Sequence, residues 1–316
     1  MMRCESYDHP ATLPTMRVLR ADALLMLVAI IWGVGFVIQR TAMETIGPMT
    51  FTAVRLLLGM VSMLPLLLVA RRLQPATMKR TSRGKLLLAL TGAGLAMCFG
   101  AVLQQAGLVH TTAGIAGFIT GLYVVFVPLL GLVVGYFVRW TTWSAVAVAT
   151  AGLYLLSVHG QPTLNPGDLL VLLGSIAWAT QVLIIGWLAL RCDPVRIAVY
   201  QTAFAGVVTL GVAIPWEQPE LAAVLLLWPE FLFSGVLAVG AAFLLQIIAQ
   251  QDAPPAHAAV LLAMEAVFGA LAGWAFLSEE LSATQLVGCL LMFIGIVLAQ
   301  LRPPRPLEQD SIEPAS

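Results

Sequence analysis

The side chains best placed to do chemistry are the few charged residues inside long apolar stretches. Glu265 and Arg55 each stand within a segment long enough to cross a bilayer. Glu265 lies about ten residues into its segment, roughly 15 Å deep at 1.5 Å per residue, which is near the midplane. A charge at that depth costs on the order of 3 kcal/mol even on a lenient insertion scale. Glu265 must therefore face a polar cavity, find a partner or bind a proton.

Two interpretations of each charge stay open from the residues alone. Glu265 either contacts a substrate amine or carries a coupling proton, or it is a protonated acid that hydrogen-bonds between helices. Arg55 lies about 12 Å below the surface. It either extends its guanidinium toward water or is a fixed cation in a cavity, paired with a substrate carboxylate or with Glu265. Two such charges in one cavity would suit a zwitterion such as an amino acid.

Aromatic and amide side chains near the middle of other apolar segments are further candidates. Most tryptophans fall at segment ends, as an aromatic belt requires, but Trp32 and Trp178 do not. They either fill the core or line a central cavity. The remaining candidates are Gln181, three residues after Trp178, and Gln104, Gln246 and Tyr123. Each amide needs a hydrogen-bond partner in hydrocarbon, so helix-to-helix bonding is the alternative role.

Other kinds of site are not predicted. His110 and His257 lie near expected helix boundaries, which is typical of solvated caps, and no metal site is expected. No H-E-x-x-H, G-x-S-x-G or P-loop motif occurs, so no catalytic residues, cofactor or ATPase domain are predicted. The formal net charge is zero, which predicts no nucleic-acid partner.

Composition defines the elements that must position these residues. Apolar residues make up 60% of the chain and charged residues 10%, whereas soluble domains carry about 25% charged residues. The sequence therefore predicts an all-α integral membrane protein. Helices of roughly 20 apolar residues span a bilayer, and ten such segments are expected: 22–40, 48–70, 86–108, 114–136, 142–158, 168–189, 195–214, 231–250, 255–277 and 282–301.

Lys and Arg placement predicts the orientation of these spans. With a cytoplasmic N-terminus, cytoplasmic segments carry Arg3, Arg17, Arg20, Arg71, Arg72, Lys79, Arg80, Arg83, Lys85, Arg139, Arg191, Arg196, Arg302 and Arg305, and the other side carries only Arg40. This bias satisfies the positive-inside rule with both termini cytoplasmic. The predicted organisation is a tail (1–21), a first repeat (22–158), an external connector (159–167), a second repeat (168–301) and a disordered tail (302–316).

The two halves repeat each other at a spacing of about 145 residues. The alignment places Trp32 over Trp178 and Arg55 over Gln201. It also places Gln104 over Gln246, Tyr123 over Glu265, and Gly152 over Gly295. Five spans per repeat is an odd number, so the repeats must insert in opposite orientations. Inverted repeats of this kind allow a central site to open alternately to either side.

The chain resembles the drug/metabolite transporter superfamily, specifically EamA-type members with two five-helix repeats. The resemblance rests on Trp32-Gly33 with Phe36, on Arg55, on Gly114–Pro128, and on LLAMEAVFGALAGWAFLSEELSATQLVGCLLMFIGIVLA. Ala266 stands where the family usually has a proline after this glutamate. The resemblance implies transport of small metabolites, often amino acids or drug-like molecules, and often outward.

These observations together predict a secondary transporter of the bacterial inner membrane that works by alternating access, as a monomer or a dimer. Its partners are a small-molecule substrate and the lipid bilayer. Coupling to protons and facilitated passage both stay open. The alternatives are a membrane-embedded enzyme acting on a lipid-soluble substrate, which would need an assembled acid-base or metal cluster, and a passive channel, which would need a continuous polar stripe.

Overall fold

The computed structural model describes residues 12–68, 81–136, 138, 140–157, 165–277 and 282–300, and every regular element in these ranges is helical. The first repeat contains α1 (Thr12–Ala42), α2 (Pro48–Met63), the 3-10 helix η1 (Leu64–Leu68), α3 (Arg83–Leu108), α4 (Ala113–Gly121), α5 (Tyr123–Val133) and α6 (Trp140–Ser157). The second contains α7 (Pro166–Leu188), α8 (Pro194–Glu217), α9 (Leu221–Leu226), α10 (Trp228–Phe231), the π-helix η3 (Leu232–Ala241), α11 (Ala242–Ala249), α12 (Pro255–Leu262), α13 (Glu265–Leu277) and α14 (Ala283–Gln300).

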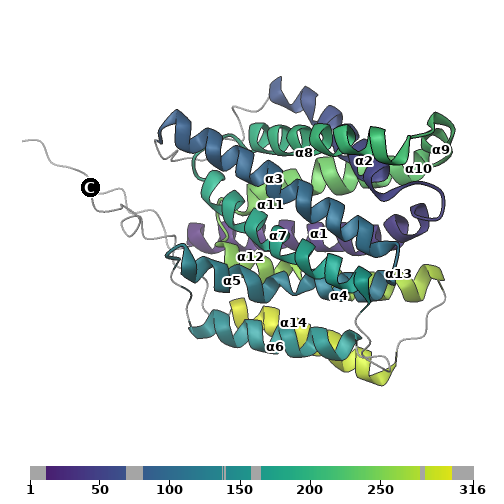
Figure 1. Ribbon diagram of the computed structural model, residues 1–316. Helices are drawn as coiled ribbons and strands as arrows, with labels where there is room; N and C mark the ends of the chain where they lie inside the picture. Colours follow the sequence, from purple (N-terminus) through teal and green to yellow (C-terminus); the bar gives the residue numbers. More distant parts are fainter. Residues whose placement is uncertain are drawn as a thin grey trace, which may run out of the picture.

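The predicted all-α membrane architecture is confirmed. Within the described ranges, eight helical stretches are long and apolar enough to cross a bilayer, and Ala283–Leu298 is a shorter apolar helix. The eight stretches match eight of the expected spans. The expected fifth and tenth spans correspond to α6 and α14, which are helical and pack against each other at one edge of the bundle (Figure 1). The total of ten crossings stays a prediction.

Two element boundaries differ from the sequence prediction. α1 begins at Thr12, inside the stretch expected to be a tail; Pro14 lies in its first turn, where proline is tolerated, and most of residues 16–20 are exposed. α7 begins at Pro166 rather than at 168. Asn165 and Asp168 form a reciprocal capping box there, with 2.9 and 3.0 Å hydrogen bonds, and proline suits the first helical turn.

One span in each repeat is broken near its middle, at corresponding positions. α4 ends at Gly121 and α5 begins at Tyr123, while α12 ends at Leu262 and α13 begins at Glu265. The break in the second repeat forms without a proline, since Ala266 stands where the resembled family usually has one. Discontinuous helices are a common way for transporters to bring polar groups to the bilayer midplane.

Helix pairs related by the repeat cross in antiparallel fashion. Gly152 of α6 packs against segment 288–292 of α14, and Gly295 packs against segment 145–149. The repeat alignment maps each of these two contacts onto the other. The pairing also shows direction, because the later residue of α6 meets the earlier segment of α14. A two-fold axis that relates two antiparallel helices is perpendicular to them. For helices that span a membrane, such an axis lies in the membrane plane.

The pair α2 and α8 shows the same relation. Near the start of α2, the backbone N–H groups of Met49 and Thr50 donate 2.9 and 2.7 Å hydrogen bonds to the Glu217 carboxylate at the end of α8. About two turns further along α2, Leu57 lies against Gly206. α2 and α8 are therefore antiparallel as well. The contacts fit two repeats of opposite orientation.

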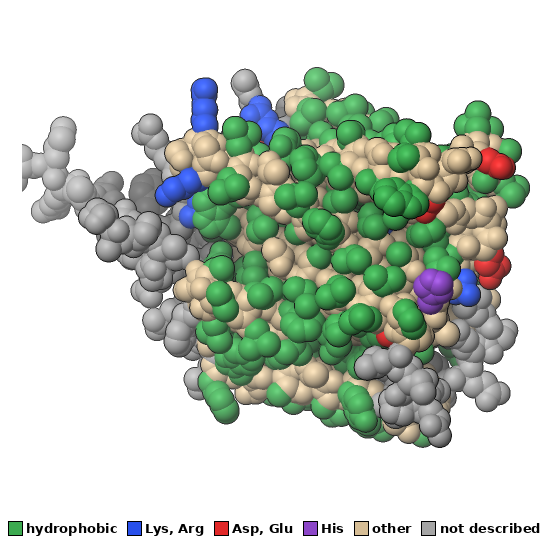
Figure 2. All heavy atoms as spheres, in the orientation of Figure 1, with side chains coloured by type: hydrophobic (Ala, Val, Ile, Leu, Met, Phe, Trp, Pro, Cys, Tyr) green, Lys and Arg blue, Asp and Glu red, His purple; other side chains and the backbone are tan. Residues whose placement is uncertain are grey.

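Charged side chains mark the two ends of the bundle. Arg17, Arg20, Arg83, Lys85, Arg191 and Arg196 lie at the end where α1 begins, and Arg40 lies at the opposite end, where α1 finishes (Figure 1). Figure 2 shows basic groups at one edge, acidic groups toward the other, and apolar side chains over the face between them. We call the end of the bundle where α1 begins the basic end, and the opposite end the Arg40 end.

Candidate functional site

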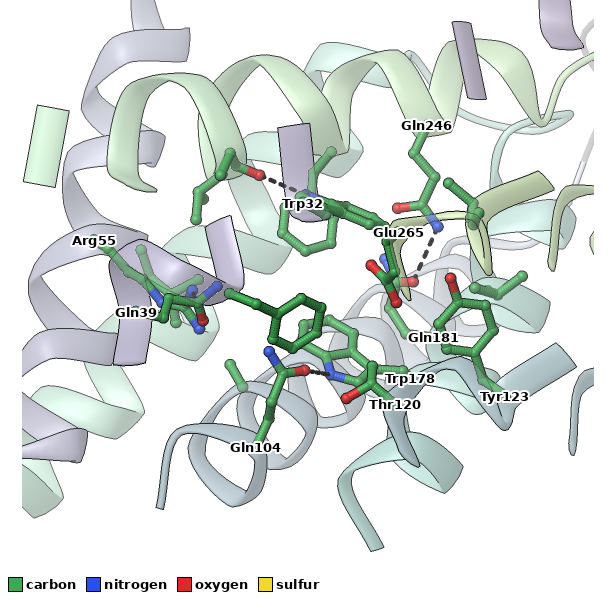
Figure 3. A pocket seen from close by; sticks show the side chains of 18 residues that line it. Trp32, Gln39, Arg55, Gln104, Thr120, Tyr123, Trp178, Gln181, Gln246 and Glu265 are labelled. Atoms are coloured by element: carbon green, nitrogen blue, oxygen red, sulfur yellow. Dashed lines mark hydrogen bonds between the residues drawn. The ribbon is translucent and has the colours of Figure 1, made fainter. Parts of the chain in front are cut away.

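A cavity lies at the centre of the bundle, between the two repeats. It is lined by residues from α1, α2, α3, α4 and α5 of the first repeat and from α7, η3, α11, α12 and α13 of the second (Figure 3). Its free volume is about 50 Å³, which holds roughly four waters at 10–15 Å³ each. The eight residues predicted from the sequence all line this one cavity: Trp32, Arg55, Gln104, Tyr123, Trp178, Gln181, Gln246 and Glu265. Their role in binding stays a prediction.

Three aromatic side chains pack together and form one part of the cavity wall. Phe243 of α11 lies between the two central tryptophans, with ring centroids 4.8 Å from Trp32 and 5.7 Å from Trp178. Each indole N–H is fixed by a hydrogen bond, from Trp32 to the Ala238 carbonyl at 2.9 Å and from Trp178 to Oε1 of Gln104 at 2.8 Å. The rings are therefore held in place and present apolar faces to the cavity.

Arg55 is a fixed cation in the cavity wall. Its side chain is buried, and Nη1 donates a 2.7 Å hydrogen bond to Oε1 of Gln39 on α1. Its guanidinium also lies 5.7 Å from the ring centre of Phe51. The interpretation in which Arg55 reaches toward water is therefore wrong. Nε of Arg55 has no hydrogen-bond partner, so the group keeps one donor available.

Glu265 is placed by the break in its span, as the first residue of α13. A carboxylate at a helix N-terminus is stabilised by the unpaired backbone N–H groups and the helix dipole. This lowers the cost of a charge at the midplane. The Tyr123 hydroxyl, from the first residue of α5, faces the same carboxyl group (Figure 3). Neither that hydroxyl nor Oε1 of Glu265 completes a hydrogen bond of good geometry, and the two groups interact with each other.

Buried amides join the second-repeat helices on the basic-end side of the cavity. Gln246 donates to Gln181 at 3.3 Å and to Gln250 at 3.2 Å, while Gln181 donates to Gln201 at 3.3 Å. Gln250 in turn donates to the Val182 carbonyl at 2.9 Å. For Gln181 and Gln246 the structure thus combines both interpretations, because they line the cavity and also bond between helices.

The cavity extends farther toward the Arg40 end. Gln39 and Arg55 line it there, but Ile185 and Gln201, their counterparts in the repeat alignment, are fully buried outside it. The two ends of the cavity are therefore unequal. The structure is closed more deeply on the basic-end side.

Sequence reasoning missed several lining residues, including Gln39, Thr120 and Phe243. Gln39 was assigned to the end of its span, and Phe243 resembles any apolar packing residue. Gln39 carried a usable signal, since it is a buried amide on α1 in register with Trp32 and Phe36. One prediction was wrong: His257 is not a solvated cap. It is only 4% exposed and contacts Asp22, because α12 packs against α1 at this point. His110 is exposed, as expected.

Two antiparallel helical repeats around a central cavity with polar side chains in its wall define a multi-pass helical membrane protein with an internal chamber. The chain belongs to the EamA-like transporter family, whose model matches residues 19–158 and 165–301. It is therefore a membrane transporter.

Known proteins of similar sequence carry matching names. The chain is 29% identical over 287 residues to an "Uncharacterized transporter" of Archaeoglobus fulgidus, covering 90% of this chain and 87% of that protein. It is 25% identical over 296 residues to the Escherichia coli (strain K12) "Uncharacterized inner membrane transporter YedA", covering 91% and 94%. A solved structure titled "Crystal structure of protein" matches with a TM-score of 0.71 at 17% identity, covering 92% and 98%, and so supports the fold.

Proposed function

We propose that this protein is a secondary transporter of the bacterial inner membrane that exports a small metabolite by alternating access. One observation carries the proposal: a single cavity with a buried cation, a buried acid and an aromatic cluster lies between two antiparallel repeats. Such repeats permit two conformations of similar energy that open the same site to opposite sides. At about 50 Å³, the cavity holds a few waters, so a larger solute requires its walls to move apart.

The lining favours a zwitterion such as an amino acid. Arg55 offers an unpaired Nε donor for a carboxylate, and Glu265 offers an unpaired Oε1 for an amine. The Trp32, Phe243 and Trp178 rings form an apolar wall of the same cavity. Ion pairing at both ends of a zwitterion would compensate the cost of holding two opposite charges in hydrocarbon.

We also propose that both termini are cytoplasmic. The basic residues gather where α1 begins, which is the arrangement expected for a cytoplasmic face. Export then means passage from the basic end to the Arg40 end. Glu265 is a candidate carrier of a coupling proton, since an acid at this depth can exchange its proton for a substrate amine.

Counterflow in proteoliposomes tests the proposal. Vesicles containing the full chain are loaded with a millimolar mixture of unlabelled amino acids and diluted into a trace of the radiolabelled mixture. Transient accumulation of label above equilibrium is expected, because an alternating-access carrier exchanges solute across the membrane. Label that only equilibrates would indicate a channel, and a chemically altered product would indicate an enzyme; either result overturns the proposal.

Matched arginine variants separate the cavity cation from surface charge. Arg55→Gln removes the buried guanidinium, whereas Arg40→Gln removes a partly exposed guanidinium at the Arg40 end. Arg55→Gln is expected to reduce counterflow at least tenfold, and Arg40→Gln to keep it within twofold. Equal effects of the two variants would show that the cavity cation has no special role.

A further inference from the structure

Arg55 carries a buried positive charge that no acid in the described part of the chain compensates. The residue is 6% exposed, and no carboxylate of a described residue forms an ion pair with its guanidinium. The Phe51 ring, 5.7 Å away, attracts the charge but supplies no oxygen acceptor. A buried charge is costly unless it is paired, so this arrangement points to an anionic partner that binds in the cavity.

The guanidinium of Arg55 keeps one of its edges unpaired. In any arginine, Nε–H and one N–H of Nη2 lie side by side and match the two oxygens of a carboxylate. Nε of Arg55 has no hydrogen-bond partner, and the hydrogen bond that the guanidinium makes to a described residue uses Nη1, which is outside that edge. The Nε–Nη2 edge is therefore the part of Arg55 suited to a bidentate, side-on contact.

Gln39 fixes the orientation of that guanidinium. Its Oε1 accepts the 2.7 Å hydrogen bond from Nη1, and its Nε2 donates a 3.1 Å hydrogen bond to the Gly35 carbonyl one turn earlier on α1. A rotated amide would place its donors against the guanidinium and its oxygen against the carbonyl, so both partners select the same amide orientation. Gln39 is buried and lines the cavity. It therefore holds Nη1 without occupying the edge that a carboxylate needs.

The amide and the guanidinium are replaced together in the second repeat. In the repeat alignment Gln39 corresponds to Ile185 and Arg55 to Gln201, and both counterparts are fully buried outside the cavity. A repeat of this fold therefore packs without the cation and without its acceptor. Their joint presence in the first repeat indicates a shared role at the Arg40 end of the cavity.

We propose that Gln39 is a positioning residue, which holds Arg55 so that its Nε–Nη2 edge binds the carboxylate of the solute side-on. The inference rests on the proposed transport of a solute with a carboxylate, and it assigns recognition of that group to geometry as well as to charge. Nε is buried in this conformation, so the carboxylate reaches the edge as the cavity widens to admit the solute. The bound solute then has its carboxylate toward the Arg40 end.

Loss of the Gln39 amide would affect some solutes more than others. Nη1 would lose its acceptor, and the side-on edge would no longer be held in one direction. Binding of a carboxylate should weaken, because its two oxygens need both donors of that edge in place. A carboxamide carries no negative charge and offers one oxygen acceptor, so its binding depends less on the edge. The role of Gln39 is therefore visible in the preference for acids over amides.

Binding to the detergent-solubilised full chain tests this role. One probe is an equimolar mixture of the standard amino acids without aspartate and glutamate, whose side chains carry a second carboxylate. The other probe is the mixture of the corresponding α-carboxamides. A ligand that binds the folded state raises the melting temperature by mass action, so the concentration that gives a set rise reports affinity. The measured quantity is the amide-to-acid ratio, which is the carboxamide concentration divided by the amino-acid concentration that gives the same rise.

In the wild-type chain the amide-to-acid ratio should be about ten or more, because only the carboxylate can make the bidentate, charge-assisted contact. Gln39→Met removes the amide at similar volume and should lower the ratio about fivefold. Arg55→Lys keeps the charge but lacks the planar edge, so it should lower the ratio as well, and it is the second variant should the first not fold. The matched control is Gln105→Met. Gln105 is a fully buried amide on α3, outside the cavity, that donates a 3.3 Å hydrogen bond to the Gln39 backbone carbonyl, and its loss should leave the ratio unchanged.

Each result decides the proposal. A wild-type ratio near one, or no stabilisation by either mixture, overturns it. A ratio that persists in Gln39→Met or in Arg55→Lys, or one that falls equally in Gln105→Met, also overturns it. Because binding in detergent requires no transport, a ratio that behaves as expected together with failed counterflow would refute the transport proposal alone. Counterflow together with a ratio unaffected by Gln39→Met would refute the positioning role alone.

Discussion

The crossing of α1 and α13 makes a sharp prediction, because it holds Trp32 and Glu265 on the same cavity. A methyl group added at Gly33 would lie 2.6 Å from Cβ of Phe268 and 2.7 Å from the backbone oxygen of Glu265. An ordinary Cβ contact is 3.4 Å or longer, so the helices would have to separate by about 0.8 Å. Backbone and Cβ atoms cannot rotate away. Overpacking of this kind costs about 1–3 kcal/mol.

The same crossing supplies its own control. A methyl group added at Gly269 of α13 would lie 3.5 Å from the Gly33 oxygen, which is ordinary contact. Gly33→Ala should therefore lower the melting temperature by roughly 2–12 °C, using about 2–4 °C per kcal/mol, whereas Gly269→Ala should change it by about 1 °C or less. Size-exclusion chromatography of heated, detergent-solubilised protein measures both values. Equal losses, or a larger loss for Gly269→Ala, would refute this account of the crossing.

Three further predictions concern the cavity and the basic end. Glu265→Gln should abolish counterflow or remove its pH dependence while expression persists; unchanged pH-dependent flux would exclude Glu265 from the mechanism. Trp32→Ala and Trp178→Ala should each raise the apparent KM for the transported solute, while Trp140→Ala, on an exposed residue, should not; loss of folded protein in the first two would indicate packing roles instead. Partial desolvation raises the pKa of Asp252 above its ordinary value although the residue is exposed, so its ionised form destabilises the fold only slightly at neutral pH, because water screens the charge. Asp252→Asn should therefore raise the melting temperature slightly at pH 7, with the difference vanishing as pH falls below about 4; a lower melting temperature at pH 7 would contradict that sign.

Much of the site was predictable because hydrocarbon makes polar residues conspicuous. Glu265 and Arg55 were identified by the cost of placing a charge in an apolar span. Trp32 and Trp178 were identified because they fall outside the aromatic belt. In each case the position of the residue within its span predicted its depth in the bilayer. The repeat alignment then identified the corresponding residue in the other half of the chain. The same reasoning predicted helices where the structure has them.

The remaining features depend on tertiary packing that one sequence does not encode locally. Phe243 lies between two tryptophans only because α11 packs beside both α1 and α7. His257 lies at a helix start, which usually means exposure, and it is buried only because α12 packs against α1 there. The π-helix η3, whose Ala238 carbonyl accepts the Trp32 hydrogen bond, has no proline within Leu232–Ala241, and its glycines resemble those of the regular helices. Likewise, nothing in the residues before Glu265 marks the break between α12 and α13.

Alternating exposure of the central cavity is the claim that matters most, and cysteine labelling from each side of the membrane tests it directly. Thr120 is 3% exposed, lines the cavity and has an unpaired hydroxyl, so Thr120→Cys is a conservative probe in a chain without its native cysteines. Ser175→Cys, fully buried outside the cavity, is the control that should stay unlabelled. A membrane-impermeant thiol reagent should modify the cysteine at position 120 both in right-side-out and in inside-out vesicles, because each side opens in turn. Modification from one side only would contradict alternating access.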